Sequence, residues 1–290
     1  MQKSRFMLLT IGPAAIFLFF LLFAVLWSFY ISFTDFSLVG RAARDPQFVG
    51  FKNYTKLFND PTFYNSIKIS FIFTILSAFI GQAVLGLLLA IFLKQVNATI
   101  KVLVIVAVTL CWIMPDMVAV YVWGAFTSRS GLLNTILNWL KLSAVNWLGK
   151  MPLQTVTIAN IWRGTAFSMM LFSSAIETIP PDYYEAAVVD GATSWQKFKS
   201  ITLPLISPSI LMDLILITMW TFGYFTLIYG LTGGGPGHLT EVFPVLIYNQ
   251  AFSHYEIGYG AALSFIMMII VGCLCGIYFI LLRKAERMVY

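Results

Sequence analysis

Six long apolar runs constrain the fold of this 290-residue chain more than any other feature. A membrane-spanning helix needs about 20 predominantly apolar residues, and each of the six runs reaches that length. The chain is 59% hydrophobic and only 10% charged, and a soluble globule has too little interior to bury so much apolar surface. We therefore expect an all-α, polytopic membrane protein with one domain at 1–290 and spans at about 7–33, 67–93, 102–126, 153–176, 208–231 and 259–282.

Positive charges flank the first and last apolar runs. Lys3 and Arg5 precede the first run, and Arg283, Lys284 and Arg287 follow the last one. Because cytoplasmic flanks of spans are enriched in lysine and arginine, six spans predict a multi-pass protein of the cytoplasmic membrane with both termini in the cytoplasm. The lysines and arginines behind the net charge of +6 lie singly or in pairs at the ends of apolar runs, so they indicate contact with membrane lipid and not with nucleic acid.

The sequence offers no catalytic or metal-binding set. Cys111, Cys273 and Cys275 lie inside apolar runs without C-x-x-C spacing, and His238 and His254 have no ligand neighbours at metal-binding spacing. The run GGGPG is not followed by the lysine that a nucleotide-binding loop needs for the phosphates. We expect neither enzyme activity nor a cofactor on this chain.

The one long polar stretch between two apolar runs is the loop at residues 177–207. Pro180 and Pro181 end the preceding helix, and Asp182 with Glu185 predicts a capping box at the start of a short helix. Gly191 is expected to end that helix in the left-handed conformation.

A second short helix is predicted after that glycine. Thr193 and Gln196 repeat the capping pattern, and the helix is expected to run from Trp195 to about Thr202 and to end at Pro204. Ser207, as N-cap, and Pro208, in the first turn, predict the start of the next span.

The amino-acid sequence of this loop resembles that of a known family. EAAVVDGA at 185–192, followed by ITLPLISP at 201–208, resembles the cytoplasmic EAA loop of permease subunits of ABC importers, specifically the carbohydrate-uptake, maltose-type group. The resemblance implies the type I ABC importer permease fold with six spans. It also makes residues 177–207 the coupling loop, and it assigns coupling to the ATPase to six residues: Tyr184, Glu185, Ala186, Ala187, Asp190 and Gly191.

The same resemblance implies a function and a set of partners. The chain would be the permease subunit of an ATP-driven importer that carries a mono-, di- or oligosaccharide, or a sugar or glycerol phosphate, across the cytoplasmic membrane. A second, homologous permease, two ATPase subunits that hold ATP and Mg, and an extracytoplasmic substrate-binding protein would complete it. FVGFKNYTKLF at 48–58 resembles the family's first external loop, where the binding protein would make contact.

A substrate path follows from the resemblance as well. Counting back from LTGGGP at 231–236 places Trp220, Thr221 and Tyr224 on one lining helix, and counting back from the coupling loop places Arg163, Gly164 and Phe167 on another. Aromatic rings can pack on the C–H faces of a sugar, while the guanidinium and the hydroxyl groups can hydrogen-bond its hydroxyls.

Three charged residues fall within the apolar runs. Asp116 follows Pro115, which predicts a kink in the third run; Arg163 interrupts the fourth run, and Asp213 lies in the fifth. Charged groups in a membrane are costly and usually face the protein interior. Two roles stay open at this point, an ion pair of Arg163 with either aspartate or contact with substrate. The alternative function is an ion-coupled secondary transporter or channel in which both aspartates bind the ion.

Overall fold

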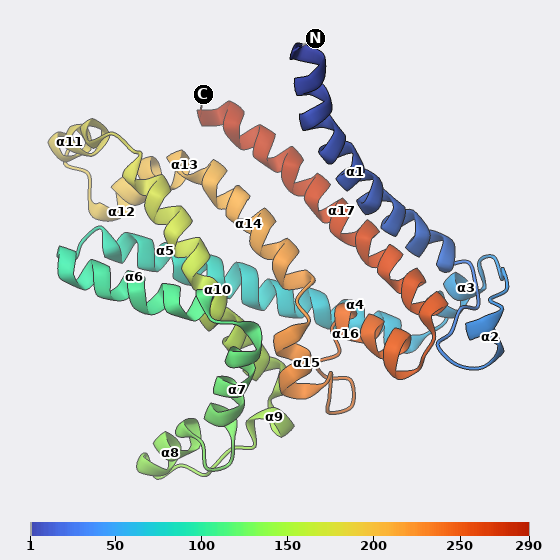
Figure 1. Ribbon diagram of the computed structural model, residues 1–290. Coiled ribbons are helices and arrows are strands. Elements are labelled where there is room, and N and C mark those ends of the chain that lie inside the picture. The colour runs from blue at the N-terminus through green and yellow to red at the C-terminus, as the bar shows by residue number, and fades with distance from the viewer. Residues whose placement is uncertain (1, 290) are drawn as a thin grey trace. The chain divides into compact units, whose positions relative to one another are not determined.

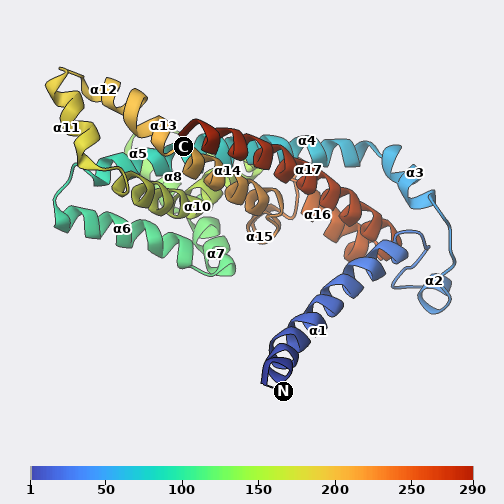
Figure 2. The ribbon, with the colours of Figure 1, turned by 90° about the horizontal axis from the view of Figure 1, so that it is seen from above.

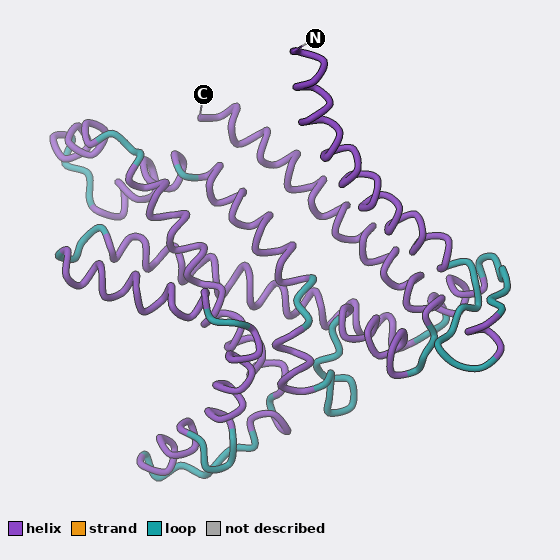
Figure 3. The backbone as a smooth tube through the Cα atoms, viewed as in Figure 1, coloured by secondary structure: helices purple, strands orange, loops and turns teal. Residues whose placement is uncertain are grey.

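The computed structural model describes residues 2–289, and helices joined by loops make up most of it (Figures 1 and 3). Among these residues, the β pairing is one isolated bridge between Thr34 and Phe48. The predicted all-α class is confirmed. The helices are α1 (Gln2–Ile31), α2 (Arg41–Arg44), α3 (Lys52–Phe58), α4 (Pro61–Thr74), α5 (Val84–Leu93), α6 (Ala98–Ile113), α7 (Asp116–Thr127), α8 (Leu132–Trp139), α9 (Trp147–Lys150), α10 (Pro152–Glu177), α11 (Pro181–Val189), α12 (Ser194–Lys197), α13 (Leu203–Leu205), α14 (Ser207–Phe222), α15 (Thr226–Thr232), α16 (Phe243–Tyr248) and α17 (Ile257–Val289), with π-helical segments η1 (Ile75–Ala83), η2 (Phe198–Thr202) and η3 (Asn249–Ser253).

The chain forms two compact units, Met1–Phe63 with Leu246–Ile270 and Tyr64–Val245 with Val271–Tyr290. In the first unit, the Asn53 amide donates to the carbonyl of Ser32 and to that of Thr34, each over 2.8 Å. In the same unit, the backbone N–H of Gln47 and the guanidinium of Arg41 hold the pKa of the Asp35 carboxyl below its ordinary value. The single transmembrane domain stays a prediction.

Three helical stretches among the described residues are long and apolar enough to cross a membrane: Ile11–Ile31, Pro61–Leu93 and Ile257–Lys284. The number rises to five if each of two bent helix pairs counts as one span. Helix α10, which covers the predicted span 153–176, has 26 residues and is therefore about 39 Å long, but its threonine, serine and asparagine side chains lower its hydropathy. The six-span count stays a prediction.

Two predicted spans are broken, which corrects their expected course. Pro115 has no N–H to donate and disfavours the helical conformation for Met114, whose ψ is 130°. Helix α6 therefore ends at Ile113, and the following segment Asp116–Trp139 is turned by 105°, so the expected kink is a break. The span expected at 208–231 stops at Phe222, and α15 begins only at Thr226.

Other helices are longer or more continuous than the sequence predicts. The second span begins at Pro61 and not near residue 67, because the Asp60 carboxylate accepts the N–H of Thr62 over 2.8 Å and caps the helix. At the predicted fourth span, α10 continues through Arg163 and Gly164 without a break. The last helix extends beyond the predicted 259–282 at both ends.

Helix α10 packs against both α5 and α6 in the second unit; Figure 1 shows it crossing the two, and Figure 2 shows it with α5 on one side and α6 on the other. The contact with α5 is close because Gly86 has no side chain: a Cβ there would lie 2.5 Å from the Ser168 Cβ and 2.8 Å from the Met169 nitrogen. On the α14 side, the Ser168 hydroxyl donates to a buried carboxylate oxygen of Asp213 over 3.0 Å. Ser168 therefore lies where α5, α10 and α14 meet.

Candidate functional site

The first helix of the coupling loop begins two residues earlier than expected, at Pro181 and not at Tyr183. Pro181 occupies its first turn, Pro180 is the N-cap, and no side-chain capping bond forms, so the predicted capping box of Asp182 and Glu185 is wrong. The Asp182 charge lies in the first turn instead, near the positive end of the helix. Gly191 has a φ of +72°, which confirms the left-handed residue that ends the helix.

The second capping box is confirmed. The Thr193 hydroxyl accepts the N–H of Gln196 over 3.3 Å, and the Gln196 side chain accepts the N–H of Thr193 over 2.7 Å. Helix α12 then continues through η2 into α13, which ends at Leu205, one residue after the predicted end at Pro204. Ser207 is also not an N-cap, since it lies within α14 after Ile206.

The six residues assigned to ATPase coupling divide by exposure. Helix α11 buries none of its residues, and the Glu185 carboxylate is exposed and joins no ion pair among the described residues. Tyr184 points inward: its hydroxyl shares a hydrogen bond of 2.9 Å with the Thr202 hydroxyl, and the Lys94 ammonium lies 3.9 Å from its ring centroid. The exposed residues are Glu185, Ala186, Asp190 and Gly191, and the half-buried ones are Tyr184 and Ala187.

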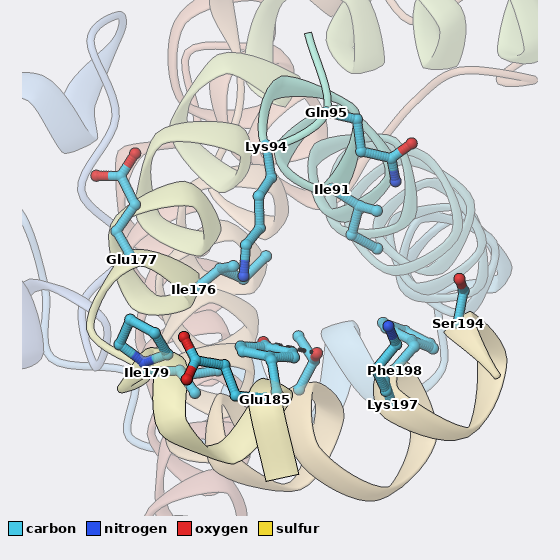
Figure 4. Close-up of a pocket in the computed structure, with 13 residues that line it drawn as sticks. Ile91, Lys94, Gln95, Ile176, Glu177, Ile179, Glu185, Ser194, Lys197 and Phe198 are labelled. Atoms are coloured by element: carbon cyan, nitrogen blue, oxygen red, sulfur yellow. Dashed lines mark hydrogen bonds between the residues drawn. The ribbon is translucent and has the colours of Figure 1, made fainter. Parts of the chain in front are cut away.

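A cavity of about 700 Å³ separates the loop from the ends of α5 and α10. Figure 4 shows Lys94 extending into this cavity from the end of α5, with Glu185 on the facing wall. Ile91 and Ile176 form part of its apolar lining. Sequence reasoning did not find this cavity, because residues from three separate segments enclose it.

The polar cluster, defined here as Asp116, Arg163 and Tyr224, forms where the two broken spans meet α10. Arg163 pairs with the Asp116 carboxylate, donates from Nη1 to the Tyr224 hydroxyl over 2.8 Å, and donates from Nη2 to the Met114 carbonyl over 3.2 Å. The Tyr224 hydroxyl donates to Asp116 over 3.2 Å. Of the two possible aspartate partners of Arg163, the structure thus pairs it with Asp116, while Asp213 binds Ser168.

An aromatic cluster, defined as Trp112, Phe167 and Trp220, lies beside these residues. The Phe167 and Trp220 rings are 4.8 Å apart in an edge-to-face arrangement, and the Phe167 and Trp112 rings are 6.1 Å apart. Sequence reasoning missed Trp112, although it lies four residues before Asp116 in the same apolar run.

The other two residues of the predicted path are packed within the chain. Thr221 is 4% exposed, and a Cβ on Gly164 would lie 2.2 Å from the Gln82 side-chain oxygen. For all six residues, contact with substrate stays a prediction.

Clusters of three or more metal-ligating side chains are not found among the described residues. His238 pairs instead with Glu241, three residues further on.

A helical membrane chain with a polar cluster at two helix breaks and an exposed helix on one inter-span loop has the architecture of a membrane transport subunit. Residues 82–287 match the family described as "Binding-protein-dependent transport system inner membrane component", and the chain belongs to this family. It is thus a transport component of a membrane and not an enzyme, as the sequence predicted.

Relatives place the chain in the carbohydrate-uptake group of ABC importer permeases. It is 33% identical to the trehalose/maltose transport system permease protein MalF of Thermococcus litoralis, over 87% of this chain and 84% of that one. It is 31% identical to the sulfoquinovosyl glycerol transport system permease protein SmoG of Agrobacterium fabrum, over 96% of this chain and 90% of that one.

A solved structure shares the fold. A chain of the bacterial alginate ABC transporter, in complex with an alginate pentasaccharide-bound periplasmic protein, superposes with a TM-score of 0.76 at 24% identity, covering 99% of this chain and 93% of that one. The type I ABC importer permease fold expected from the coupling loop is therefore confirmed.

Proposed function

We propose that this chain carries a saccharide across the cytoplasmic membrane as one of two homologous permeases. An extracytoplasmic binding protein delivers the sugar, and two ATPase subunits, which hold the ATP and Mg, drive its transport; the chain itself holds no cofactor. The names of the two relatives support a carbohydrate substrate, since they specify trehalose, maltose and sulfoquinovosyl glycerol.

The observation that carries this proposal is the exposure of α11. A short helix without a buried residue, and with a carboxylate that lacks an ion-pair partner among the described residues, is suited to bind a partner protein. In the proposed mechanism α11 sits in a cleft of an ATPase subunit and Glu185 pairs with a basic residue there. Closure of the ATPases on ATP moves α11, and the spans change from inward-facing to outward-facing.

This mechanism fixes the orientation that we propose. ATP is on the cytoplasmic side, so the coupling loop at 177–207 is cytoplasmic, and six spans place both termini there as well.

The polar and aromatic clusters support the proposed substrate path. Trp220 is 51% exposed, so its ring is available for the C–H face of a pyranose. Arg163 already has a carboxylate partner in Asp116, which favours an uncharged saccharide such as trehalose or maltose over an anionic one such as a sugar phosphate or sulfoquinovosyl glycerol.

Charge reversal at Glu185 tests the proposal. The variant Glu185→Lys is studied in the complex assembled from both permeases, the ATPases and the binding protein. We expect it to reduce ATP-driven uptake and substrate-stimulated ATP hydrolysis by at least about tenfold, because the new lysine would repel the basic residue of the ATPase with which Glu185 pairs. Lys150→Glu reverses a charge at an exposed residue at the end of α9, outside both the coupling loop and the predicted substrate path, and is expected to leave both rates unchanged. Full activity of the Glu185→Lys complex would refute the coupling role.

A further inference from the structure

Helix α11 touches the structure beneath it at very few points. None of its residues is buried, and only Tyr184 and Ala187 are half-buried. The cavity of about 700 Å³ lies on one side of this contact (Figure 4), and a second cavity of about 260 Å³ lies beneath the other end of the helix, beside Asp190 and Gly191. Because a cavity lies on each side of this contact, only a few side chains can transmit a displacement of α11 to the rest of the permease.

Tyr184 makes the specific contacts at this point. Its ring lies under the ammonium of Lys94, the residue that caps the C-terminal end of α5, and its hydroxyl bonds to Thr202 at the end of η2. Tyr184 also packs against the apolar cluster that includes Ile176 of α10 and Ile206.

These contacts lead toward the proposed substrate path by two routes. Helix α5 meets α10 at the close contact of Gly86 with Ser168, one residue after Phe167 of the aromatic cluster. Thr202 precedes α13 and α14, and α14 carries Trp220. Both routes start at the Tyr184 side chain, whereas the other half-buried residue, Ala187, has only a methyl group.

We propose that Tyr184 is the positioning residue that transmits the movement of α11 to α5 and α14, and that it acts through the Lys94 ammonium and the Thr202 hydroxyl. This proposal rests on the proposed function, and it separates two roles within the loop. Glu185 binds the ATPase, while Tyr184 faces the permease and passes the movement on.

The test follows a conformational change and needs no knowledge of the sugar. In the assembled complex, with the three native cysteines replaced by serine, maleimide labelling at Trp220→Cys is measured with and without ATP in the presence of EDTA, which prevents hydrolysis. The wild-type loop is expected to give a clear change of labelling rate on ATP addition. Tyr184→Leu is expected to lose most of that change in labelling rate. Lys94→Met is expected to reduce the change about two- to fivefold, which corresponds to the interaction free energy of an exposed cation–π contact.

Conservative variants separate transmission from mere folding. Lys94→Arg and Tyr184→Phe retain the cation and the ring respectively and are expected to keep most of the response. The double variant Lys94→Met/Tyr184→Leu is expected to respond no less than Tyr184→Leu alone. A purely structural role would lower the yield of assembled complex and leave the ATP response per complex unchanged.

The outcomes are distinct. An undiminished ATP response in assembled Tyr184→Leu and Lys94→Met complexes would overturn the proposal while leaving the proposed function intact. Absence of any ATP response with the wild-type loop would instead contradict the proposed function itself. If Tyr184→Leu does not assemble, Lys94→Met still decides, because Lys94 is exposed and its loss leaves no cavity.

Discussion

Gly86→Leu is expected to prevent the stable packing of α5 against α10. A Cβ alone would lie 2.5 Å from Ser168 Cβ and within 3 Å of backbone atoms, and backbone cannot rotate away as a flexible side chain can. Overpacking of this kind costs about 3 kcal/mol or more, a large part of the stability of a typical domain. The yield of folded chain in detergent and its thermal unfolding midpoint measure the effect.

Gly272→Leu is the matched control, since it adds the same side chain to a helical glycine with nothing within 4 Å of the new Cβ. We expect its yield and unfolding midpoint to stay close to those of the wild type. Equal effects of the two substitutions would show that any leucine at such a glycine is harmful, and the close contact of α5 with α10 would lose its support.

Arg163→Met is expected to destabilise the region where the two broken spans meet α10. It leaves the Asp116 carboxylate with only the Tyr224 hydroxyl, and it removes the donor to the Met114 carbonyl. Breaking a buried ion pair costs about 3–5 kcal/mol, but these side chains retain 21% and 32% of their exposure, so we expect about 1–3 kcal/mol. The loss of thermal stability in detergent measures this cost.

The double variant Arg163→Met/Asp116→Asn separates the ion pair from other roles. Removal of both charges is expected to recover more than half of the lost stability, because no unpaired carboxylate remains. An Arg163→Met chain as stable as the wild type would show that Asp116 does not depend on Arg163.

The apolar runs predicted where helices lie better than where they end. Hydropathy identifies 102–126 and 208–231 as long enough to span a membrane, but a hydropathy average does not reveal that the helix breaks at Pro115 or at Gly223. Pro115 ends α6, and Arg163 stabilises the turn of 105° that follows, because it donates to the Met114 carbonyl that is left without a helical partner; Arg163 comes from a helix about 50 residues away in the sequence. Tertiary contacts of this kind cannot be predicted from a local pattern.

Within the coupling loop, local rules worked where the partners are neighbours in sequence. The Thr193 capping box and the left-handed Gly191 require only a few adjacent residues, and both are confirmed. Tyr184 points inward to Lys94, which belongs to another segment, and to Thr202, which lies 18 residues further along the loop, so the motif alone placed it on the ATPase-binding face together with Glu185. The family's sequence pattern identified the loop, and the packing separates its residues.

ATP-driven uptake in proteoliposomes tests the central claim most directly. Vesicles that contain this chain, the second permease, the ATPases and the binding protein are supplied with radiolabelled trehalose, maltose or sulfoquinovosyl glycerol, each in a separate assay. Each assay is run with and without ATP on the side of the membrane where the ATPases lie. The account predicts accumulation of at least one of these sugars that requires ATP, the ATPases and the binding protein together. Accumulation by this chain alone, driven by an ion gradient without any ATPase, would contradict it.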